Sequence, residues 1–131
     1  MRGDRLSHEQ VARIFYALLR QLREEQGYQR GPVWNLLTAE EQGWYERSIE
    51  LARMGLLPAQ IHASWASDAG QDGWTCGPEI DRNGKTHPEM ASWDELDSRY
   101  RLRFILLQMV TTGLTIDVPD VWGASRAVTA L

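Results

Sequence analysis

The sequence predicts a mainly α-helical domain, with four helices and one long loop rich in glycine and proline. Apolar residues recur at helical spacing in four segments, capping-box patterns precede three of them, and residues 70–91 have no such period. At 131 residues the chain is long enough to bury one core, so we expect a single domain over residues 1–131, ending in a tail at 114–131.

Composition and charge narrow the classes of function. A net charge of −4 argues against a general nucleic-acid binder, which normally presents a basic face. The single cysteine excludes an internal disulfide and fits a reducing compartment. No apolar run approaches membrane-spanning length, and the first residues lack the apolar core of a signal peptide. We therefore expect a cytoplasmic protein with no membrane partner.

The first helix is predicted between Ser7 and Gly27. Ser7 and Gln10 have the spacing of a capping box, and Gly27 is a typical residue to end a helix. Arg23 falls off the apolar stripe and is expected on the polar side. The residues of that stripe are Val11, Ile14, Phe15, Leu18, Leu19 and Leu22.

Two further helices follow in the middle of the chain. Thr38 and Glu41 form a second capping-box pattern, and Pro58 suits the first turn of a third helix, "PAQIHASWASDA". In that third helix His62 and Trp65 share a face, because they are three residues apart. The expected inner face of the second helix consists of Trp44, Tyr45, Ile49, Leu51, Ala52 and Leu56.

The long loop is expected to form either a short two-stranded hairpin or a set of turns, and extended pieces could lie at "GWTCG" and "EIDRNGK". Asn83-Gly84 is a strong turn signal. Ser92 with Glu95 resembles a third capping box, so the last helix is expected to start there and stop near Gly113. Its inner stripe is expected to be Leu102, Ile105, Leu106, Met109 and Val110.

The tryptophans near the loop suggest two roles. Six tryptophans are present, and such large rings should be buried or should line a concavity. Trp65 and Trp74 could sandwich a planar ring, since stacking on an aromatic side chain contributes about 1–3 kcal/mol per base. The alternative, favoured on spacing alone, is that both rings simply fill the core.

Polar residues of the loop add a second signal. Lys85 and His87 on a turn held by Pro88 could meet phosphate or carboxylate oxygens, or they could be a solvated lysine and a backbone-bonded histidine. Asp81 could orient Lys85 or accept a ribose hydroxyl. Because acidic residues outnumber basic ones here, a multiply phosphorylated ligand would need help from Arg99, Arg101 or Arg103 on the last helix.

Metal binding and catalysis are poorly supported by the pattern. His62, Cys76, Asp81 and His87 are suitable ligand types, but no close pair has zinc-site spacing. Cys76 with a histidine could form a nucleophile and base, yet no nucleophile elbow or phosphate-cradling glycine motif accompanies it. We expect no enzyme, no catalytic residue, no metal and no cofactor.

The stretch "IHASWASDAGQDGWTCGPEIDRNGKTHPEMASWDEL" resembles the core signature of the ryanodine-receptor-type (RyR) domain. In that family a histidine three residues before a tryptophan is followed by Gly-Trp, an aromatic-Gly pair, an aspartate and Lys-x-His-Pro. The matching positions here are His62, Trp65, Gly73-Trp74, Cys76-Gly77, Asp81, and Lys85-Thr86-His87-Pro88, ending in Trp93 through Leu96. This chain departs from the family pattern at Ala69, Cys76 and Ser92-Trp93, where lysine, tyrosine and Pro-Tyr are usual.

The resemblance implies a compact four-helix RyR-type domain with a core at about residues 8–113. The chain looks like the small stand-alone RyR-domain proteins of bacteriophages and bacteria, and this resemblance implies a location in the cytoplasm of a bacterial host. The prokaryotic versions look like sensors or binders of nucleotide-derived ligands, including signals of antiviral defence, so an anti-defence sequestering role is implied.

Two functions follow from the sequence. The first is a non-enzymatic binding module for a small nucleotide-like ligand. The alternative is a protein-interaction or structural module, such as a homodimer or a groove for a partner chain. The candidate ligand-binding residues are His62, Trp65, Trp74, Cys76, Asp81, Lys85, His87, Trp93, Arg99 and Arg103.

Overall fold

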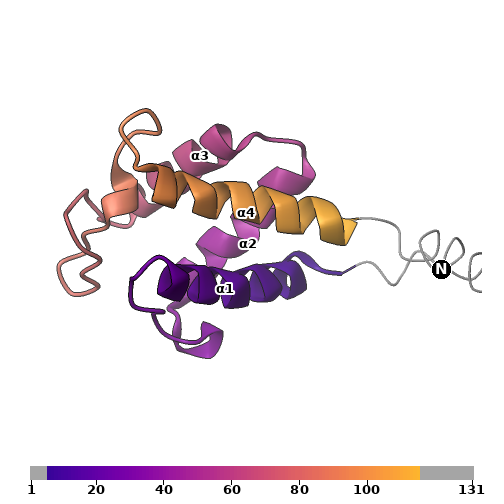
Figure 1. Cartoon of the computed structure of the whole chain (residues 1–131), viewed down its shortest axis with the longest axis horizontal. Coiled ribbons are helices and arrows are strands. Elements are labelled where there is room, and N and C mark those ends of the chain that lie inside the picture. The colour runs from indigo at the N-terminus through magenta and orange to yellow at the C-terminus, as the bar shows by residue number, and fades with distance from the viewer. Residues whose placement is uncertain (1–5, 116–131) are drawn as a thin grey trace, which may run out of the picture.

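Four α-helices make up most of the chain that the computed structural model describes, residues 6–115 (Figure 1). They are α1 His8–Glu25, α2 Ala39–Arg53, α3 Pro58–Gln71 and α4 Ser98–Thr115, with short 3-10 helices η2 Trp34–Leu36 and η3 Pro88–Met90. The predicted mainly α-helical fold is confirmed. Of the predicted tail at 114–131, residues 116–131 lie outside the part of the chain that the structure describes.

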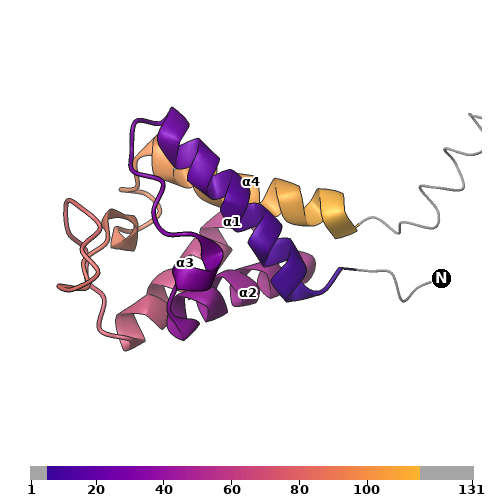
Figure 2. The same ribbon diagram turned by 90° about the horizontal axis from the view of Figure 1, so that it is seen from below.

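Helix α2 packs against the other three helices, and α4 also contacts α1 and α3. The segment between α3 and α4 lies at one end of this bundle, while α1 begins and α4 ends toward the other (Figures 1 and 2). Within residues 6–115, no helix combines the length and the apolar character needed to cross a membrane.

The first two helices begin where the sequence predicts. The Ser7 hydroxyl accepts a bond from the Gln10 backbone N–H at 3.1 Å, and the Gln10 side chain accepts from the Ser7 N–H at 2.8 Å. Thr38 and Glu41 form the same reciprocal pair at the start of α2. These bonds satisfy backbone donors that a helix start leaves open, which is why the pattern is a good sequence signal.

The predicted start of the last helix is wrong. Residues 92–96 form turns, in which the Glu95 N–H donates to the Ser92 carbonyl at 3.0 Å, and α4 starts only at Ser98. The Asp97 carboxylate caps it by accepting the Arg99 N–H at 2.9 Å. The four-residue pattern from Ser92 to Glu95 is thus not a sufficient signal here, because the Asp97 carboxylate caps the helix instead.

The predicted inner faces of α1 and α4 need correction. In α1, Ile14 and Leu18 are 40% and 44% exposed, whereas Arg23 is buried at 5%. In α4, Phe104 and Leu107 are buried and Leu102, Ile105 and Met109 face outward. Helix α4 carries apolar residues all round, so periodicity alone could not choose its face.

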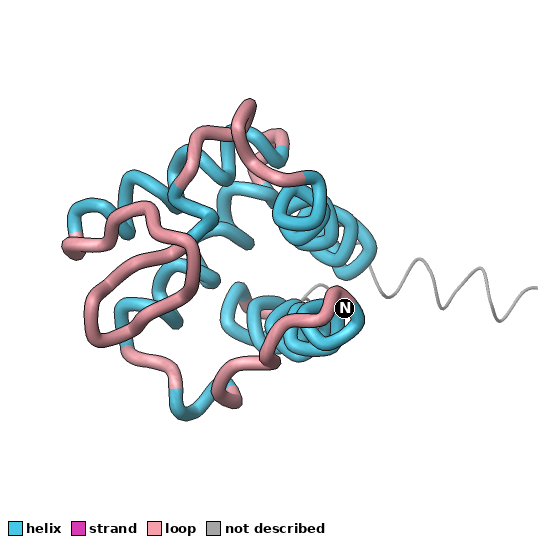
Figure 3. Tube along the Cα trace, turned by 60° about the vertical axis from the view of Figure 1, so that its left-hand side comes forward, coloured by secondary structure: helices cyan, strands magenta, loops and turns pink. Residues whose placement is uncertain are grey.

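The segment between α3 and η3 is held by isolated bridges and forms no strand in the described chain (Figure 3). Thr86 pairs with Thr75 and with Asp81 in single bridges, so of the two predicted forms of the loop the structure has the set of turns and no two-stranded hairpin among the described residues. The Asp81 carboxylate accepts the N–H groups of Asn83 and Gly84 at 3.0 and 3.1 Å, which closes the predicted turn. A Cβ at Gly84 would lie 2.7 Å from that carboxylate, so any larger residue would have to displace Asp81.

Two buried contacts fasten the end of this loop to the helices. The His62 Nε2–H of α3 donates to the Glu89 carbonyl at 2.7 Å. The Arg103 guanidinium of α4 donates to the Glu89 carboxylate at 2.7 Å, and both side chains are nearly inaccessible. Glu89 therefore joins η3 to two helices at once.

Replacing Glu89 with alanine should lower the free energy of unfolding by about 3–5 kcal/mol, because it leaves the Arg103 charge buried and unpaired. Urea denaturation followed by circular dichroism measures this. The matched control is Glu9→Ala, which removes an exposed pair with Arg13 at 3.8 Å and should cost less than about 0.5 kcal/mol. Equal losses in the two variants would contradict a structural role for the buried pair.

Candidate functional site

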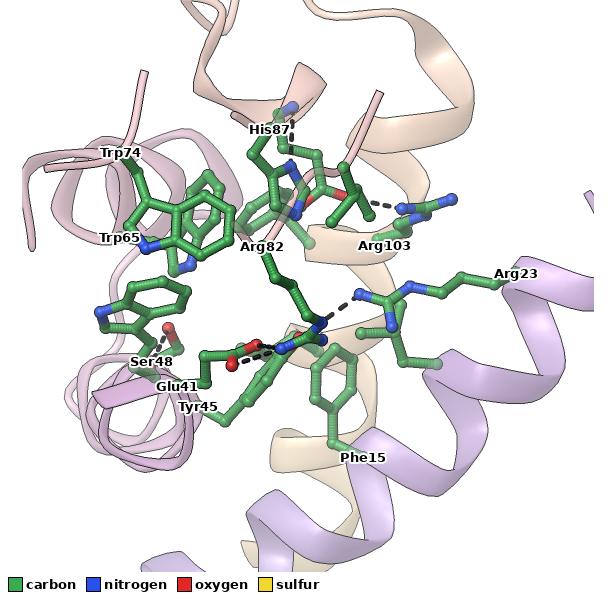
Figure 4. A pocket seen from close by; sticks show the side chains of 16 residues that line it. Phe15, Arg23, Glu41, Tyr45, Ser48, Trp65, Trp74, Arg82, His87 and Arg103 are labelled. Carbon is green, nitrogen blue, oxygen red and sulfur yellow. Dashed lines mark hydrogen bonds and ion pairs between the residues drawn. The ribbon is translucent and has the colours of Figure 1, made fainter. Parts of the chain in front are cut away.

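A cavity lies where the loop meets the four helices (Figure 4). Its cavity volume is about 40 Å³, and it is partly open to solvent. Helices α1 and α2 form one side, and α3, the loop, η3 and α4 form the rest. Six of its sixteen lining residues are aromatic, namely Phe15, Trp44, Tyr45, Trp65, Trp74 and Phe104.

The three tryptophans hold one another in a fixed geometry. Trp44 meets Trp65 edge to face at 5.9 Å between ring centroids and meets Trp74 in the same way at 5.6 Å. The Trp44 indole N–H donates to the Asp72 carboxylate at 3.1 Å, which fixes its rotation. His87 adds a ring 5.1 Å from Trp65. Edge-to-face packing is a favoured arrangement of aromatic rings, so this wall is preorganised.

Three arginines and two glutamates line the same cavity. Arg82 pairs with Glu41, and Arg103 pairs with Glu89 at 2.7 Å. Arg23 donates only to neutral oxygens, at 3.3 Å to the Arg30 carbonyl and 3.4 Å to the Tyr45 hydroxyl. The lining therefore carries one more positive than negative charge.

His87 is neutral at pH 7. Burial lowers its pKa from an ordinary 6.5 to about 4, and Arg23, Arg103 and Arg82 add to this effect against the opposing charge of Glu89. Its Nδ1 accepts the Glu89 backbone N–H at 3.1 Å, so the proton of the neutral ring sits on Nε2. The cavity thus has an uncharged imidazole with one N–H to donate.

Four of the ten predicted site residues line the cavity, namely Trp65, Trp74, His87 and Arg103. His62 and Trp93 lie outside the lining, with ring centroids 5.7 Å apart, and both pack on Phe104. These two residues support the cavity wall from behind. They do not face the open space.

The other four predicted site residues are placed elsewhere. Cys76 is exposed, and Asp81 closes the loop turn. The Lys85 ammonium donates to the Asp72 carbonyl at 2.6 Å, so Asp81 does not orient it as predicted. Arg99 is exposed and pairs with Asp97 at 3.1 Å. No three His, Cys, Asp or Glu side chains of residues 6–115 gather in a way that could hold a metal ion.

Sequence reasoning missed several lining residues, among them Arg23, Glu41, Trp44, Tyr45, Arg82 and Glu89. For Arg23 a signal existed. It follows Phe15 and Leu19 at intervals of four residues, which places all three on one face of α1. For Arg82 no local signal existed, because its partner Glu41 is far away in the sequence.

One of three comparisons with known proteins gave a match. A family model described as RyR domain matches residues 46–116, which is more than half of the chain. The match starts within α2 and includes the whole loop and α4, whereas α1 lies before it. No curated protein and no solved structure matched in the other two comparisons.

The pKa of His87 predicts a pH dependence of stability. Between about pH 6.5 and pH 4 the unfolded chain binds a proton that the folded chain does not, so stability falls as pH falls through this window. The contribution of His87 should be about 2 kcal/mol smaller at pH 5 than at pH 7.

The measurement is urea denaturation of the wild type and of His87→Asn, which keeps an acceptor for the Glu89 N–H. Other titrating groups act equally in both proteins, so the difference between them isolates His87. If both lost the same stability between pH 7 and pH 5, a depressed pKa of His87 would be ruled out.

Proposed function

This chain belongs to the RyR domain family, and from that premise we propose that it is a binding module whose cavity takes up a small nucleotide-like ligand. One observation supports this most strongly. A solvent-connected cavity combines an aromatic wall with a surplus of positive charge, which is the pairing that a planar base with an acidic group would need.

In this proposal Trp65 and Trp74 contact the planar ring of the ligand. They are fixed by Trp44, so little ordering of side chains is needed when the ligand enters, and stacking would contribute about 1–3 kcal/mol per ring. The Nε2–H of His87 would donate to an acceptor on the ligand. Neutral imidazole suits this role because it adds no further charge to the cavity.

Arg82 is the residue that we expect to move. Its side chain crosses the space between the loop and α2 to reach Glu41 and remains 41% exposed (Figure 4). Arg82 is the exposed member of this pair, whereas the Glu41 side chain is only 9% exposed and keeps its bonds to Thr38 when Arg82 turns to a ligand oxygen. Ligand entry would then shift Arg82 while the tryptophan wall stays in place.

The biological role in this proposal is that of a sensor or a sequestering protein for a nucleotide-derived signal, without a catalytic step. The proposal places the protein in a reducing cytoplasm, in keeping with its free and exposed Cys76. An origin in a phage or its bacterial host, with an anti-defence role, belongs to the same proposal.

A protein-interaction module remains the second candidate, because the helices expose apolar side chains. Ile14 and Leu18 lie one turn apart on α1, and Met109 of α4 is 65% exposed. A symmetric dimer through either helix would cover them. Light scattering of the eluting protein gives its mass, and a monomer at all concentrations would count against a dimer.

Replacing Trp74 with alanine should weaken ligand binding by about 5-fold to 150-fold, the equivalent of one lost stacking contact. A thermal-shift screen against mono-, di- and cyclic nucleotides and ADP-ribose derivatives would first find the ligand. Binding at a hundredfold excess over Kd stabilises by about 2.7 kcal/mol, which is visible as a melting shift.

The control is Leu36→Ala, which removes an apolar side chain that is 74% exposed and outside the cavity lining, and it should leave affinity within about twofold. Circular dichroism checks that both variants fold, and Trp74→Phe serves if Trp74→Ala does not. Undiminished affinity in a folded Trp74 variant would defeat the stacking role. The absence of a shift across the whole panel would favour the interaction module.

A further inference from the structure

Arg23 is the most unusual charged group of the molecule. It extends from α1 to the cavity and is only 5% exposed (Figure 4). Its two terminal nitrogens make long bonds of 3.3 and 3.4 Å to neutral oxygens. Its Nε–H is buried without a hydrogen-bond partner among the described residues. A buried donor of a charged group is costly to leave unsatisfied.

The two other arginines of the cavity differ from Arg23 in this respect. Arg82 has the Glu41 carboxylate, and Arg103 has the Glu89 carboxylate and the Gln26 side-chain oxygen. The carboxylates of the lining are therefore already engaged. The surplus positive charge of the cavity can be assigned to Arg23.

Tyr45 supplies a second donor beside this guanidinium. Its hydroxyl oxygen accepts from Arg23, which leaves the hydroxyl proton free to be donated. Burial raises the pKa of Tyr45 to about 12, against the opposing effect of Arg23, so the hydroxyl keeps its proton at neutral pH. An oxygen of a ligand could thus meet an N–H and an O–H from adjacent side chains.

We infer that Arg23 and Tyr45 form an anion subsite of the cavity, and that this subsite takes one singly charged oxyanion, a phosphodiester in a nucleotide-like ligand. The inference rests on the proposed function, because the phosphodiester is taken to be attached to the planar ring that the proposed function places against the tryptophans. A ligand charge of −1 balances the one surplus positive charge of the cavity lining. A phosphomonoester carries about −1.5 to −2 at pH 7 and a polyphosphate carries more, so both would exceed that balance.

The test follows side-chain N–H signals of the wild-type protein by ¹H–¹⁵N NMR. The arginine Nε–H and tryptophan indole signals report the subsite and the ring wall separately. Arg23→Lys and Trp74→Phe assign their signals by loss. The probes are adenosine, 3′,5′-cyclic AMP, AMP and ATP, the matching guanine series, and dimethyl phosphate as an anion without a ring.

The expected result is that a cyclic nucleotide shifts the Arg23 Nε–H signal saturably and binds about tenfold more tightly than its nucleoside. AMP and ATP should also bind more tightly than the nucleoside, but the gain in affinity should be smaller than for the cyclic nucleotide. In Arg23→Gln the advantage of the cyclic nucleotide should disappear while the nucleoside still binds. Arg99→Gln, which changes an exposed arginine outside the cavity, should bind all probes as the wild type does.

The other possible outcomes separate a failure of the anion subsite from a failure of the proposed function. If the indole signals respond to nucleosides but no anion moves the Arg23 signal, the subsite is refuted and the proposed function stands. If no ring compound moves the indole signals, the proposed function fails for these rings. Dimethyl phosphate then decides the subsite alone, since a saturable shift of the Arg23 signal supports it and an unchanged signal overturns it.

Discussion

The attachment of Glu89 to two helices is the contact on which the cavity depends. The loop between α3 and η3 forms no strand in the described chain, and its turns cannot by themselves fix where it lies. Glu89 fixes it, because its carbonyl is bound by His62 and its carboxylate by Arg103. A buried ion pair is a weak source of net stability, yet it discriminates strongly between correct and incorrect docking.

The same attachment sets the chemistry of the cavity. Once the end of the loop is fixed, His87 lies against Trp65 and is screened from water, which keeps its ring neutral. The loop also brings Arg82 to Glu41 of α2. Aromatic and charged walls thus come from segments that are distant in the sequence, and the cavity has no continuous motif of its own.

The sequence was a good guide where local bonds decide the structure. The capping boxes at Ser7 and Thr38 predicted two helix starts, and Asn83-Gly84 predicted the turn. It was a poorer guide where tertiary packing decides, as at α4, for which the predicted start was wrong and only Leu106 and Val110 of the predicted inner stripe pack against the core. Four candidate site residues line the cavity, and three of them, Trp65, Trp74 and His87, come from one short segment that the sequence signals as a unit. The position of Arg82 depends instead on Glu41, a partner forty-one residues away.

Helix α1 gives Phe15, Leu19 and Arg23 to the cavity, yet it lies before the residues that the family model matches. The lining of the cavity is therefore split between the part of the chain that the family model matches and a helix that precedes it. These three side chains are also among the buried ones of the molecule, at 2%, 3% and 5% exposed. The face of α1 that shapes the cavity is therefore the same face that packs into the core, so a change to this side of the cavity is also a change to the packing of the helices.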